Sequence, residues 1–574
     1  MNKNLKKICI GPKNTLKEAM DLMNSNKPEV TLLPPGIILV VNKNQKLLGI
    51  LTDGDIRRAL AKEIKIEDLV ERAMNKNPFF IETENLKSSA DILLLISDQI
   101  RKGQWRKNYF ERIIVVDKKR RVKNLLSLPD LLRSGDVRFK HIGIFGLGYV
   151  GLTLGLTLAD LGFEVKGFDS NPRVAKAIKK GRPHFFEMGL EPLFKDHSGK
   201  GFKVVDNFQG ENACDVYFIT VGTPLKKNKK PDLDHLGQCV RTLGGILKRG
   251  NAVIVRSTVP VGITRNFIIP LLEKHSSLKA GNDFLISFAP ERTVEGRALE
   301  ELRKLPQVIG GFNRASADLT ASIFSFMTDS MFLVDSLEEA EIVKLVNNTY
   351  RDVIFAFANE VSLICQKWGI NTHRVIEAAN AGYERSNVPQ PSPGVGGYCL
   401  EKDPFIFIES AKRKSYSPLL ALNAREISNR ILNSIADSIF DFLKKNKKTT
   451  KNSKIFILGL AFKGQPLTSD TRGSTSLLLA RKLQKKGYQN IWGFDPMVAK
   501  EAAVQSKIKY AADIRKGFDR ADVILIMNNN PDFEKIEMRR YLNFSRSPIL
   551  FFDAWHLFHK EEIEKVSGVI YKTL

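Results

Sequence analysis

The chain has 574 residues, which is enough for roughly three to five domains of ordinary size. With 43% hydrophobic and 26% charged residues, it has the composition of a soluble globular protein. The formal net charge is +26, but much of it lies in two lysine runs, at 226–230 and 444–454, that are typical of solvated loops. We therefore expect no nucleic-acid partner and no membrane partner. We expect the local positive charge to bind a small substrate that carries phosphate.

Cysteine usage and the first residues bear on the cellular compartment. The five cysteines are scattered, odd in number and without a C-x-x-C pair, which argues against a disulfide framework and against a zinc or other metal site. Residues 1–7 are polar and lead into no apolar segment, so no signal peptide is evident and we expect the cytoplasm. The longest charge-free stretch, 141–159, contains five glycines and favours a strand, loop and helix over a membrane span.

Residues 1–137 stand apart and contain an internal repeat. A helix is predicted at 15–23, strands at 36–41 and 47–51, and a second helix opens at Thr52; a weaker copy has a strand at 112–116, a turn at 117–121 and an apolar run at 125–132. Together with the stretch Gly49-Ile50-Leu51-Thr52-Asp53-Gly54-Asp55, this repetition resembles a tandem pair of CBS modules. The α+β pair would be a regulatory module.

The CBS resemblance implies a nucleotide site. In that family a Thr and a later Asp commonly hold the ribose of an adenine nucleotide, and the matching residues here are Thr52 and Asp55. The second copy has Ser127 and Asp130 at the same spacing, but Asn124 replaces the usual glycine. The alternative is a module that only packs subunits together.

Strands and helices alternate from His141 onward. Short apolar strands are predicted at 141–145, 164–168, 216–220, 252–256 and 284–288, with a helix at 150–161. Such alternation favours a doubly wound parallel sheet. Two helices follow, a long one at 337–368 that is closed by Gly369 and a further one at 418–443. The lysine-rich linker then leads to a second α/β half, with strands at 454–458, 491–494 and 523–527 and a helix at 476–485.

The glycine-rich segment Gly146-Leu147-Gly148-Tyr149-Val150-Gly151 follows a strand and opens a helix, the context of a dinucleotide site. Its glycines permit a tight turn, the approach of backbone to a pyrophosphate, and close packing of helix on strand. Asp169 lies 23 residues after the first glycine, where a carboxylate bonds a ribose 2′-hydroxyl and repels a 2′-phosphate. We therefore expect NAD rather than NADP, with Arg173 close enough to leave NADP open.

The most informative segment is Gly394-Val395-Gly396-Gly397-Tyr398-Cys399-Leu400-Glu401-Lys402-Asp403. A thiol follows a glycine-rich loop and precedes a cation, which lowers a thiol's pKa, and a carboxylate that can orient a partner or shuttle a proton. This is the layout of a covalent-catalysis site, although a buried structural cysteine is the alternative. Other candidate segments are Ser257-Thr258-Val259-Pro260-Val261-Gly262, Pro290-Glu291-Arg292-Thr293-Val294-Glu295-Gly296, the helical pair Lys344 and Asn348, and Lys463, Asp470 and Arg472.

In this order the segments from about residue 140 to the end resemble the UDP-glucose/GDP-mannose dehydrogenase family of nucleotide-sugar 6-dehydrogenases. The resemblance implies four-electron oxidation of a sugar C6 alcohol by two NAD⁺, through a thiohemiacetal and then a thioester on Cys399. Details of the 290–302 and 393–397 segments resemble the branch acting on UDP-N-acetylhexosamines, with UDP-glucose or GDP-mannose as alternatives. Lys463 and Arg472 are nine apart where seven is expected, and Glu401 stands where Pro is common.

The resemblance also implies roles for single residues. Lys344 and Asn348 would stabilise oxyanion charge, Asp403 would handle protons through water, and Thr258 and Glu291, with Glu295 close by, would position or activate the hydrolytic water. Gly396, Gly397 and Lys463 would contact the substrate. Cofactor contacts would come from Gly146, Gly148, Tyr149, Val150, Gly151, Asp169, Arg173 and Thr223, and Arg472 would contact the cofactor or the domain junction.

The expected architecture is two Rossmann-like doubly wound domains joined by a long central helix, behind the CBS pair. The expected boundaries are 1–137, 138–336, 337–443 and 444–574. The family resemblance implies that the long helix is a dimerisation element, and so a homodimer or a higher oligomer, although an intrachain core explains its apolar stripe equally well. Two other functions stay open: a two-electron 3-hydroxyacid or 6-phosphogluconate-type dehydrogenase, and a nucleotide-sensing regulatory protein with an inactive enzyme body.

Overall fold

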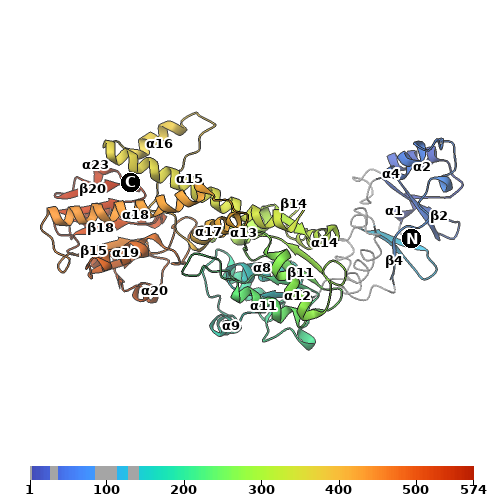
Figure 1. The fold of residues 1–574 in the computed structure, drawn as a ribbon, viewed down its shortest axis with the longest axis horizontal. Helices are drawn as coiled ribbons and strands as arrows, with labels where there is room; N and C mark the ends of the chain where they lie inside the picture. Colours follow the sequence, from blue (N-terminus) through green and yellow to red (C-terminus); the bar gives the residue numbers. More distant parts are fainter. Residues whose placement is uncertain (1–2, 26–35, 84–112, 127–140) are drawn as a thin grey trace.

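The computed structural model describes residues 3–25, 36–83, 113–126 and 141–574. Figure 1 shows the N-terminal strands at one end, the central sheet in the middle and the C-terminal sheet at the other end. The central sheet has eight strands and the C-terminal sheet has six. Two long helices, α15 (Leu337–Trp368) and α18 (Leu419–Lys445), run between the two large sheets. The predicted fold class, two parallel α/β units joined by a long helix, is confirmed.

The N-terminal region contains two similar three-stranded sheets. The first comprises β1 (Cys9–Ile10), β2 (Ile37–Val41) and β3 (Leu47–Thr52), and the second β4 (Phe80–Glu82), β5 (Ile113–Val116) and β6 (Val122–Leu126). In each sheet a parallel pair is followed by an antiparallel hairpin, and both hairpins carry an irregularity at the same point, between Val40 and Val41 and between Val115 and Val116. Apolar side chains of both hairpins share one core, which confirms the predicted repeat.

Three α-helices of this region lie within the described residues, α1 (Lys3–Lys6), α2 (Leu16–Ser25) and α4 (Asp53–Leu60), together with a short 3-10 helix at Val70–Arg72. Helix α4 begins with a capping box, because Thr52 Oγ1 accepts from the Asp55 backbone N–H while the Asp55 carboxylate accepts from the Thr52 backbone N–H. Ser127 and Asp130 lie outside the described residues.

The central sheet has eight strands in the order β14-β13-β12-β11-β10-β7-β8-β9, and all its pairs are parallel except β12 with β13. The strands are β7 (His141–Phe145), β8 (Glu164–Phe168), β9 (Phe202–Val204), β10 (Val216–Ile219), β11 (Ala252–Val255), β12 (Leu285–Phe288), β13 (Gln307–Gly311) and β14 (Met331–Val334). The helices around it are α8 (Tyr149–Asp160), α9 (Pro172–Lys179), α10 (Leu190–His197), α11 (Asp234–Gly244), α12 (Ile269–Ser276), α13 (Ala298–Lys304) and α14 (Arg314–Phe324).

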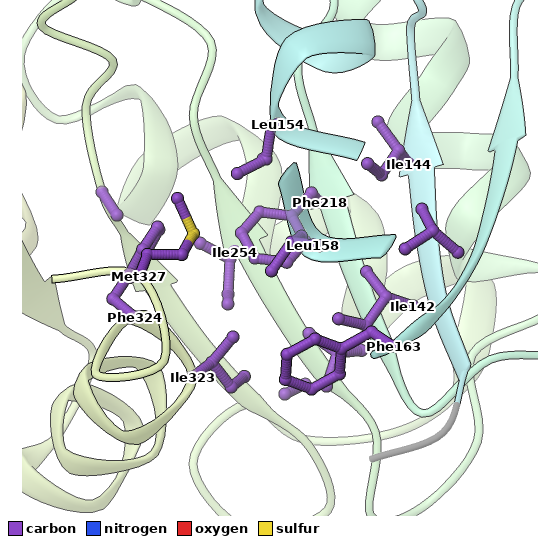
Figure 2. Close-up of a cluster of buried hydrophobic side chains, with 14 of the residues drawn as sticks. Ile142, Ile144, Leu154, Leu158, Phe163, Phe218, Ile254, Ile323, Phe324 and Met327 are labelled. Carbon is purple, nitrogen blue, oxygen red and sulfur yellow. The ribbon is translucent and has the colours of Figure 1, made fainter. Parts of the chain in front are cut away.

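The core of this sheet is built on β7 and α8. Figure 2 shows Leu154 and Leu158 of α8 beside Phe218 and Ile254 of the neighbouring strands, with Phe324 of α14 closing the cluster. Helix α8 is buried on nearly every side and carries no charge before Asp160, as expected for a helix laid across the middle of a sheet. This packing fixes the N-terminus of α8, where the glycine-rich segment lies.

Helix α15 has the predicted bounds. Ser336 caps its N-terminus by accepting from the Glu339 backbone N–H, and Gly369 ends it in the left-handed conformation at φ 67°. It packs against α17 (Tyr398–Lys412) and α18, and α16 (Thr372–Asn380) follows it. Leu345 of its predicted apolar stripe is buried, whereas Ile342, Val346, Phe357 and Ile364 are exposed, so an intrachain core does not account for the stripe.

The C-terminal sheet has six parallel strands in the order β17-β16-β15-β18-β19-β20. They are β15 (Ile455–Leu458), β16 (Ile491–Phe494), β17 (Lys509–Tyr510), β18 (Val523–Ile526), β19 (Ile549–Asp553) and β20 (Val569–Thr573), with α19 (Thr475–Lys485), α20 (Lys500–Gln505), α21 (Ile514–Phe518), α22 (Met538–Leu542) and α23 (Lys560–Ile563). Asp495 follows β16 as Asp169 follows β8, so each half has an acidic residue directly after its second strand. Among the described residues, no helix is both long and apolar enough to cross a bilayer.

Candidate active site

The glycine-rich segment has the backbone that a dinucleotide requires. Gly146 adopts φ +93°, and a Cβ on Gly151 would lie 1.8 Å from the Gly146 carbonyl oxygen, so α8 approaches β7 as closely as only glycine permits. A Cβ on Gly148 would meet nothing within 4 Å, which leaves open space at the helix N-terminus for a phosphate. These residues fit NAD.

Asp169 directly follows β8 and lies beside this segment. Its Oδ2 accepts from the Leu147 backbone N–H at 2.7 Å, so the carboxylate is fixed against the glycine-rich turn while the residue stays half-buried. Arg173 is exposed in the first turn of α9. Both residues, with Gly146 and Gly151, lie outside the lining of the cavity described next.

A cavity of about 280 Å³ brings together residues from segments that follow strands of the central sheet, from α15 and the start of α17, and from the segment that follows β15. The sequence-predicted residues that line it are Gly148, Tyr149, Val150, Thr223, Thr258, Glu291, Glu295, Lys344, Asn348, Gly396, Gly397, Cys399, Lys463 and Arg472. Segments more than 300 residues apart in sequence therefore converge on one space, and the covalent-catalysis layout predicted around Cys399 lies in it.

Cys399 is the second residue of α17. This helix begins directly after Gly397, which adopts φ +94°. Its side chain is accessible from the cavity and is not packed in hydrocarbon, so the alternative of a buried structural cysteine is wrong. Burial raises the pKa of the Cys399 thiol, Asp403 raises it further, and Lys344 and Lys402 lower it only in part. Lys402 lowers the pKa of the thiol, as the sequence predicts, but desolvation of the thiol within the cavity outweighs the cations and makes the net shift upward.

Asp403 lies behind the cavity, fully buried. Its Oδ2 accepts from Asn348 Nδ2 at 2.5 Å, and its Oδ1 accepts from Lys402 Nζ at 2.7 Å. Burial alone would lower the pKa of Lys402, but Asp403 and Cys399 raise it above its usual range, so this lysine is charged. Asn348 and Lys344 point into the cavity from the same face of α15, as their spacing predicts.

Glu291 is held by four donors. Its Oε2 accepts from Arg256 Nε at 3.0 Å and from Arg256 Nη2 at 2.8 Å, and its Oε1 accepts from the backbone N–H groups of Arg292 and Thr293. Burial alone would raise the pKa of Glu291, but Arg256 and Thr293 outweigh it and hold that pKa below its usual range. Glu291 is therefore an ionised carboxylate with its oxygens already engaged.

Glu295 differs from Glu291 in its surroundings. Burial and the nearby Asp470 raise the pKa of Glu295 to about 7, against the opposing effects of Arg472 and Lys463. Arg472 Nη2 lies 3.7 Å from Glu295 Oε1, and its stronger ion pair is with Asp470 at 2.6 Å. Lys463 Nζ donates to the Glu295 carbonyl oxygen at 2.7 Å, and burial lowers the pKa of Lys463 to about 8.

Sequence reasoning missed several residues of this site. Arg256 has a fully buried side chain that orients Glu291, and its signal was a charge at the end of an apolar strand. Arg351 lines the cavity one turn beyond Asn348, a spacing that could have revealed it. Glu187, four per cent exposed, accepts from the hydroxyl of Tyr149, and nothing local in the sequence indicates this contact.

The predicted nucleotide residues of the N-terminal module lie close together. Thr52 Oγ1 donates to Asp55 Oδ2 at 2.6 Å, and Arg58 Nη2 lies 2.6 Å from Asp55 Oδ1. The hydroxyl and the carboxylate thus bond each other at the start of α4, in a helix N-terminus that also carries Asp53.

Comparison with known proteins agrees with this geometry. Residues 140–328, 338–430 and 456–560 match, respectively, the NAD binding domain, the central domain and the UDP binding domain of the UDP-glucose/GDP-mannose dehydrogenase family, and residues 1–62 match the CBS domain. The chain belongs to the UDP-glucose/GDP-mannose dehydrogenase family. It is an NAD-dependent nucleotide-sugar dehydrogenase with an N-terminal CBS domain.

Single relatives of this dehydrogenase lead to the same family. A UDP-N-acetyl-D-mannosamine dehydrogenase of Pyrococcus horikoshii is 34% identical over 398 residues, which cover 69% of this chain and 91% of the relative. The structure titled UDP-D-ManNAc dehydrogenase from that organism matches with a TM-score of 0.68 at 31% identity, covering 75% of this chain and 98% of the other. A UDP-glucose dehydrogenase structure from Pyrobaculum islandicum matches with a TM-score of 0.65 at 26% identity, covering 76% and 97%.

Proposed function

We propose that this dehydrogenase oxidises the C6 hydroxymethyl group of a UDP-N-acetylhexosamine to a carboxylate, with Cys399 bonded to the reacting carbon between the two oxidations. The observation that carries the proposal is the position of the thiol. Cys399 opens α17 in a cavity that also contains the N-terminus of α8 and Lys463 beyond β15, so one carbon can face the sulfur, the cofactor side and the UDP-binding side together.

When bound, NAD⁺ accepts the hydride in each of the two oxidations. The C6 alcohol first loses a proton and a hydride and becomes an aldehyde. The Cys399 sulfur then bonds to the aldehyde carbon, giving a thiohemiacetal whose oxidation leaves a thioester. Water cleaves the thioester into the carboxylate and the free thiol, so each sugar gives up four electrons in total.

Lys344 and Asn348 stabilise the oxygen that carries negative charge in these steps. Both side chains reach the cavity that Cys399 lines, so both can donate to such an oxygen. Asp403 holds Asn348 from behind through the 2.5 Å bond to its amide nitrogen. Since the pKa of the resting thiol is raised, Lys344 and Lys402 also provide the positive charge that a thiolate needs when it forms.

Glu291 and Glu295 have different roles in thioester hydrolysis. Glu291, ionised and fully bonded, shapes the cavity wall next to Thr258, whose carbonyl oxygen accepts from Thr223 Oγ1 at 2.5 Å. Glu295, with a pKa of about 7, is the carboxylate that can take a proton from water near neutral pH. This assignment moves the role of the base from Glu291 to Glu295.

The proposed sugar rests on the relatives and on the chain's own segments. The Pyrococcus horikoshii relative is named for UDP-N-acetyl-D-mannosamine, and the 290–302 and 393–397 segments resemble the same branch. Gly396, Gly397 and Lys463 line the cavity and would hold the nucleotide sugar. UDP-glucose or GDP-mannose is the alternative substrate. The Pyrobaculum islandicum structure, which is named for UDP-glucose, supports the first of these alternatives.

The N-terminal module would bind an adenine nucleotide through Thr52 and Asp55. The proposal also keeps the four domain boundaries given above and a location in the cytoplasm. The Thr52–Asp55 pair supports nucleotide binding, since a hydroxyl and a carboxylate at a helix N-terminus can both contact a ribose. An enzyme body that is inactive and serves only as a nucleotide sensor is the competing reading. The intact set of Cys399, Lys344 and Asn348 in one cavity opposes it.

The exposed stripe of α15 supports a homodimer. Tyr350 is 63% exposed, Phe357 53% and Trp368 78% along one long helix, and isolated apolar residues do not normally line up in this way on a free surface. A second copy of the same helix would cover the stripe. The two active sites of such a dimer would then rest on one central helix pair.

The test is incubation of the protein with NAD⁺ and a panel of UDP- and GDP-sugars. Two NADH per sugar consumed, with a uronic acid as product, would support the proposal and identify the sugar. One NADH per sugar with free aldehyde would contradict the covalent route, and no turnover with any sugar would favour the inactive sensor.

A further inference from the structure

Glu187 is a buried carboxylate outside the predicted site. It lies between α9 and α10 and is 4% exposed, while its neighbours Phe186 and Met188 are 40% and 63% exposed. The segment therefore turns one charged side chain inward and leaves two large apolar side chains in solvent, the reverse of what hydrophobicity favours. Burial of a carboxylate is costly unless its oxygens are bonded, so its partners identify what it does.

Three donors converge on Glu187. The Tyr149 hydroxyl and the Gly296 backbone N–H donate to Oε2, the latter at 2.7 Å, and the Ala298 backbone N–H donates to Oε1 at 2.7 Å. Tyr149 belongs to the glycine-rich segment. Gly296 directly follows Glu295, and Ala298 is the first residue of α13. The carboxylate thus joins the N-terminus of α8 to the 294–298 segment.

These donors are all neutral. Among the described residues, Glu187 makes no ion pair within 4.0 Å. Burial raises the pKa of the Tyr149 hydroxyl, and Glu187 raises it further, so this phenol keeps its proton and donates it. The negative charge of Glu187 is therefore not cancelled by a cation and acts on the groups nearby.

The 294–298 segment is held from its other side by the C-terminal half. Gly296 adopts φ +94°, and a Cβ on it would lie 2.6 Å from the Leu467 carbonyl oxygen and 2.8 Å from Pro466. Lys463 Nζ bonds the Glu295 carbonyl oxygen at 2.7 Å. Glu295 therefore lies on a short bridge fixed by Glu187 on one side and by the 463–467 segment on the other.

We propose that Glu187 is a positioning residue that holds Glu295 in place for the hydrolysis of the thioester on Cys399. This inference rests on the proposed function and assigns to Glu187 one step of it, product release, and not the hydride transfers. Glu187 itself does not line the cavity, so it acts through the 294–298 segment and through its charge.

The charge of Glu187 also bears on when Glu295 is ionised. The titratable and charged groups that face Glu295 are Asp470, Arg472, Lys463, Glu187, the Tyr149 hydroxyl and the Cys399 thiol. Burial, Asp470 and Glu187 raise the pKa of Glu295, and Arg472 and Lys463 lower it. Removal of the charge on Glu187 should therefore lower the pKa of Glu295, so that the base ionises at a lower pH.

The experiment compares wild type, Glu187→Gln and Glu191→Gln in single turnovers with NAD⁺ and the sugar found in the panel above. Glu191 is an exposed carboxylate in the first turn of α10 and serves as the matched control. NADH formation reports the hydride transfers, and mass spectrometry of acid-quenched samples reports the thioester on residue 399. The pH dependence of thioester decay is measured for each protein.

For Glu187→Gln we expect hydrolysis to slow by roughly 10- to 100-fold, the loss typical of a misplaced catalytic group, while the rate of NADH formation changes less than about twofold. The thioester should then accumulate, and the midpoint of the pH profile of its decay should move to lower pH. Glu191→Gln should behave as wild type. Tyr149→Phe, which removes one donor and keeps the charge, should slow hydrolysis without moving the midpoint.

Several results would overturn the inference. Unchanged hydrolysis in Glu187→Gln would show that the carboxylate positions nothing, and an equal fall in both steps would show a merely structural role. Should Glu187→Gln fail to fold, normal hydrolysis in Tyr149→Phe would reject the inference alone. A wild type that forms no NADH with any sugar would reject the proposed function, and the inference with it.

Discussion

Asn348 of α15 donates to Asp403 of α17 through a bond of 2.5 Å, and this contact joins the two helices directly behind the cavity. Lys402, the neighbour of Asp403, completes a buried trio by donating to the other carboxylate oxygen at 2.7 Å. The amide of Asn348, which lines the cavity, and the helix that carries Cys399 are therefore fixed by one carboxylate.

Asp403→Asn should lower both stability and activity. The Lys402–Asp403 pair is almost fully buried, and loss of one partner in such a pair costs about 3–5 kcal/mol because the other charge stays uncompensated. We expect a lower midpoint of thermal unfolding and a lower kcat. The exposed Asp441→Asn on α18 provides the control, and an Asp403→Asn protein as stable and as active as that control would contradict the structural role of this pair.

Lys344→Met should lower kcat by roughly 10²- to 10³-fold, the usual cost of one oxyanion donor. The matched control is Lys367→Met, since Lys367 is exposed near the end of the same helix. Steady-state NADH formation measures both variants. A kcat within threefold of wild type for Lys344→Met would remove Lys344 from the catalytic set, and a large effect of Lys367→Met would point to damage of α15 instead.

The Cys399 thiol should react slowly with iodoacetamide at neutral pH. Burial and Asp403 raise the pKa of this thiol, so its thiolate appears only as the pH rises through that higher value. The rate of alkylation at residue 399, followed by peptide mapping, should have its midpoint above that of free cysteine. Lys344→Met should move the midpoint further up, because Lys344 lowers the pKa; a midpoint below that of free cysteine would be inconsistent with this site.

Phe357→Glu should weaken self-association. Phe357 lies in the middle of the exposed apolar stripe of α15, where a carboxylate in a buried helix pair would have no partner. Light scattering after size-exclusion chromatography should show a dimer or larger species for wild type and a smaller species for the variant. Lys176→Glu on α9 is the control for charge reversal, and identical masses for all three proteins would place the interface elsewhere.

Much of the fold followed from sequence periodicity. The predicted helix 337–368 has those bounds because its caps, Ser336 and Gly369, are local signals. The strands at 141–145 and 164–168 were likewise predicted residue for residue from apolar runs ended by glycine or acid. The glycine-rich turn was predictable because Gly146 and Gly151 each have a steric reason and the spacing of the glycines is a local signal.

The electrostatics of the site were less predictable. Arg256 meets Glu291 across 35 residues and Glu187 meets Gly296 across 109, and such pairs depend on packing that no local pattern encodes. The net upward direction of the Cys399 pKa shift was not predictable for the same reason, because the neighbouring lysine that lowers this pKa is visible in the sequence and the desolvation that raises it is not. The sequence could not predict that the apolar stripe of α15 is exposed, because apolar residues with the same periodicity fit a buried core equally well.

The central claim is the covalent bond between sulfur 399 and the oxidised carbon, and peptide mapping by mass spectrometry of acid-quenched turnover mixtures tests it most directly. Glu295→Gln, in which hydrolysis should be slow, is mixed with NAD⁺ and the UDP-sugar, and Cys399→Ser is carried through in parallel. The account predicts the acyl mass of the oxidised UDP-sugar on the peptide that contains Cys399, and none in Cys399→Ser. Uronic acid produced at an undiminished rate by Cys399→Ser, with no adduct in either protein, would contradict it.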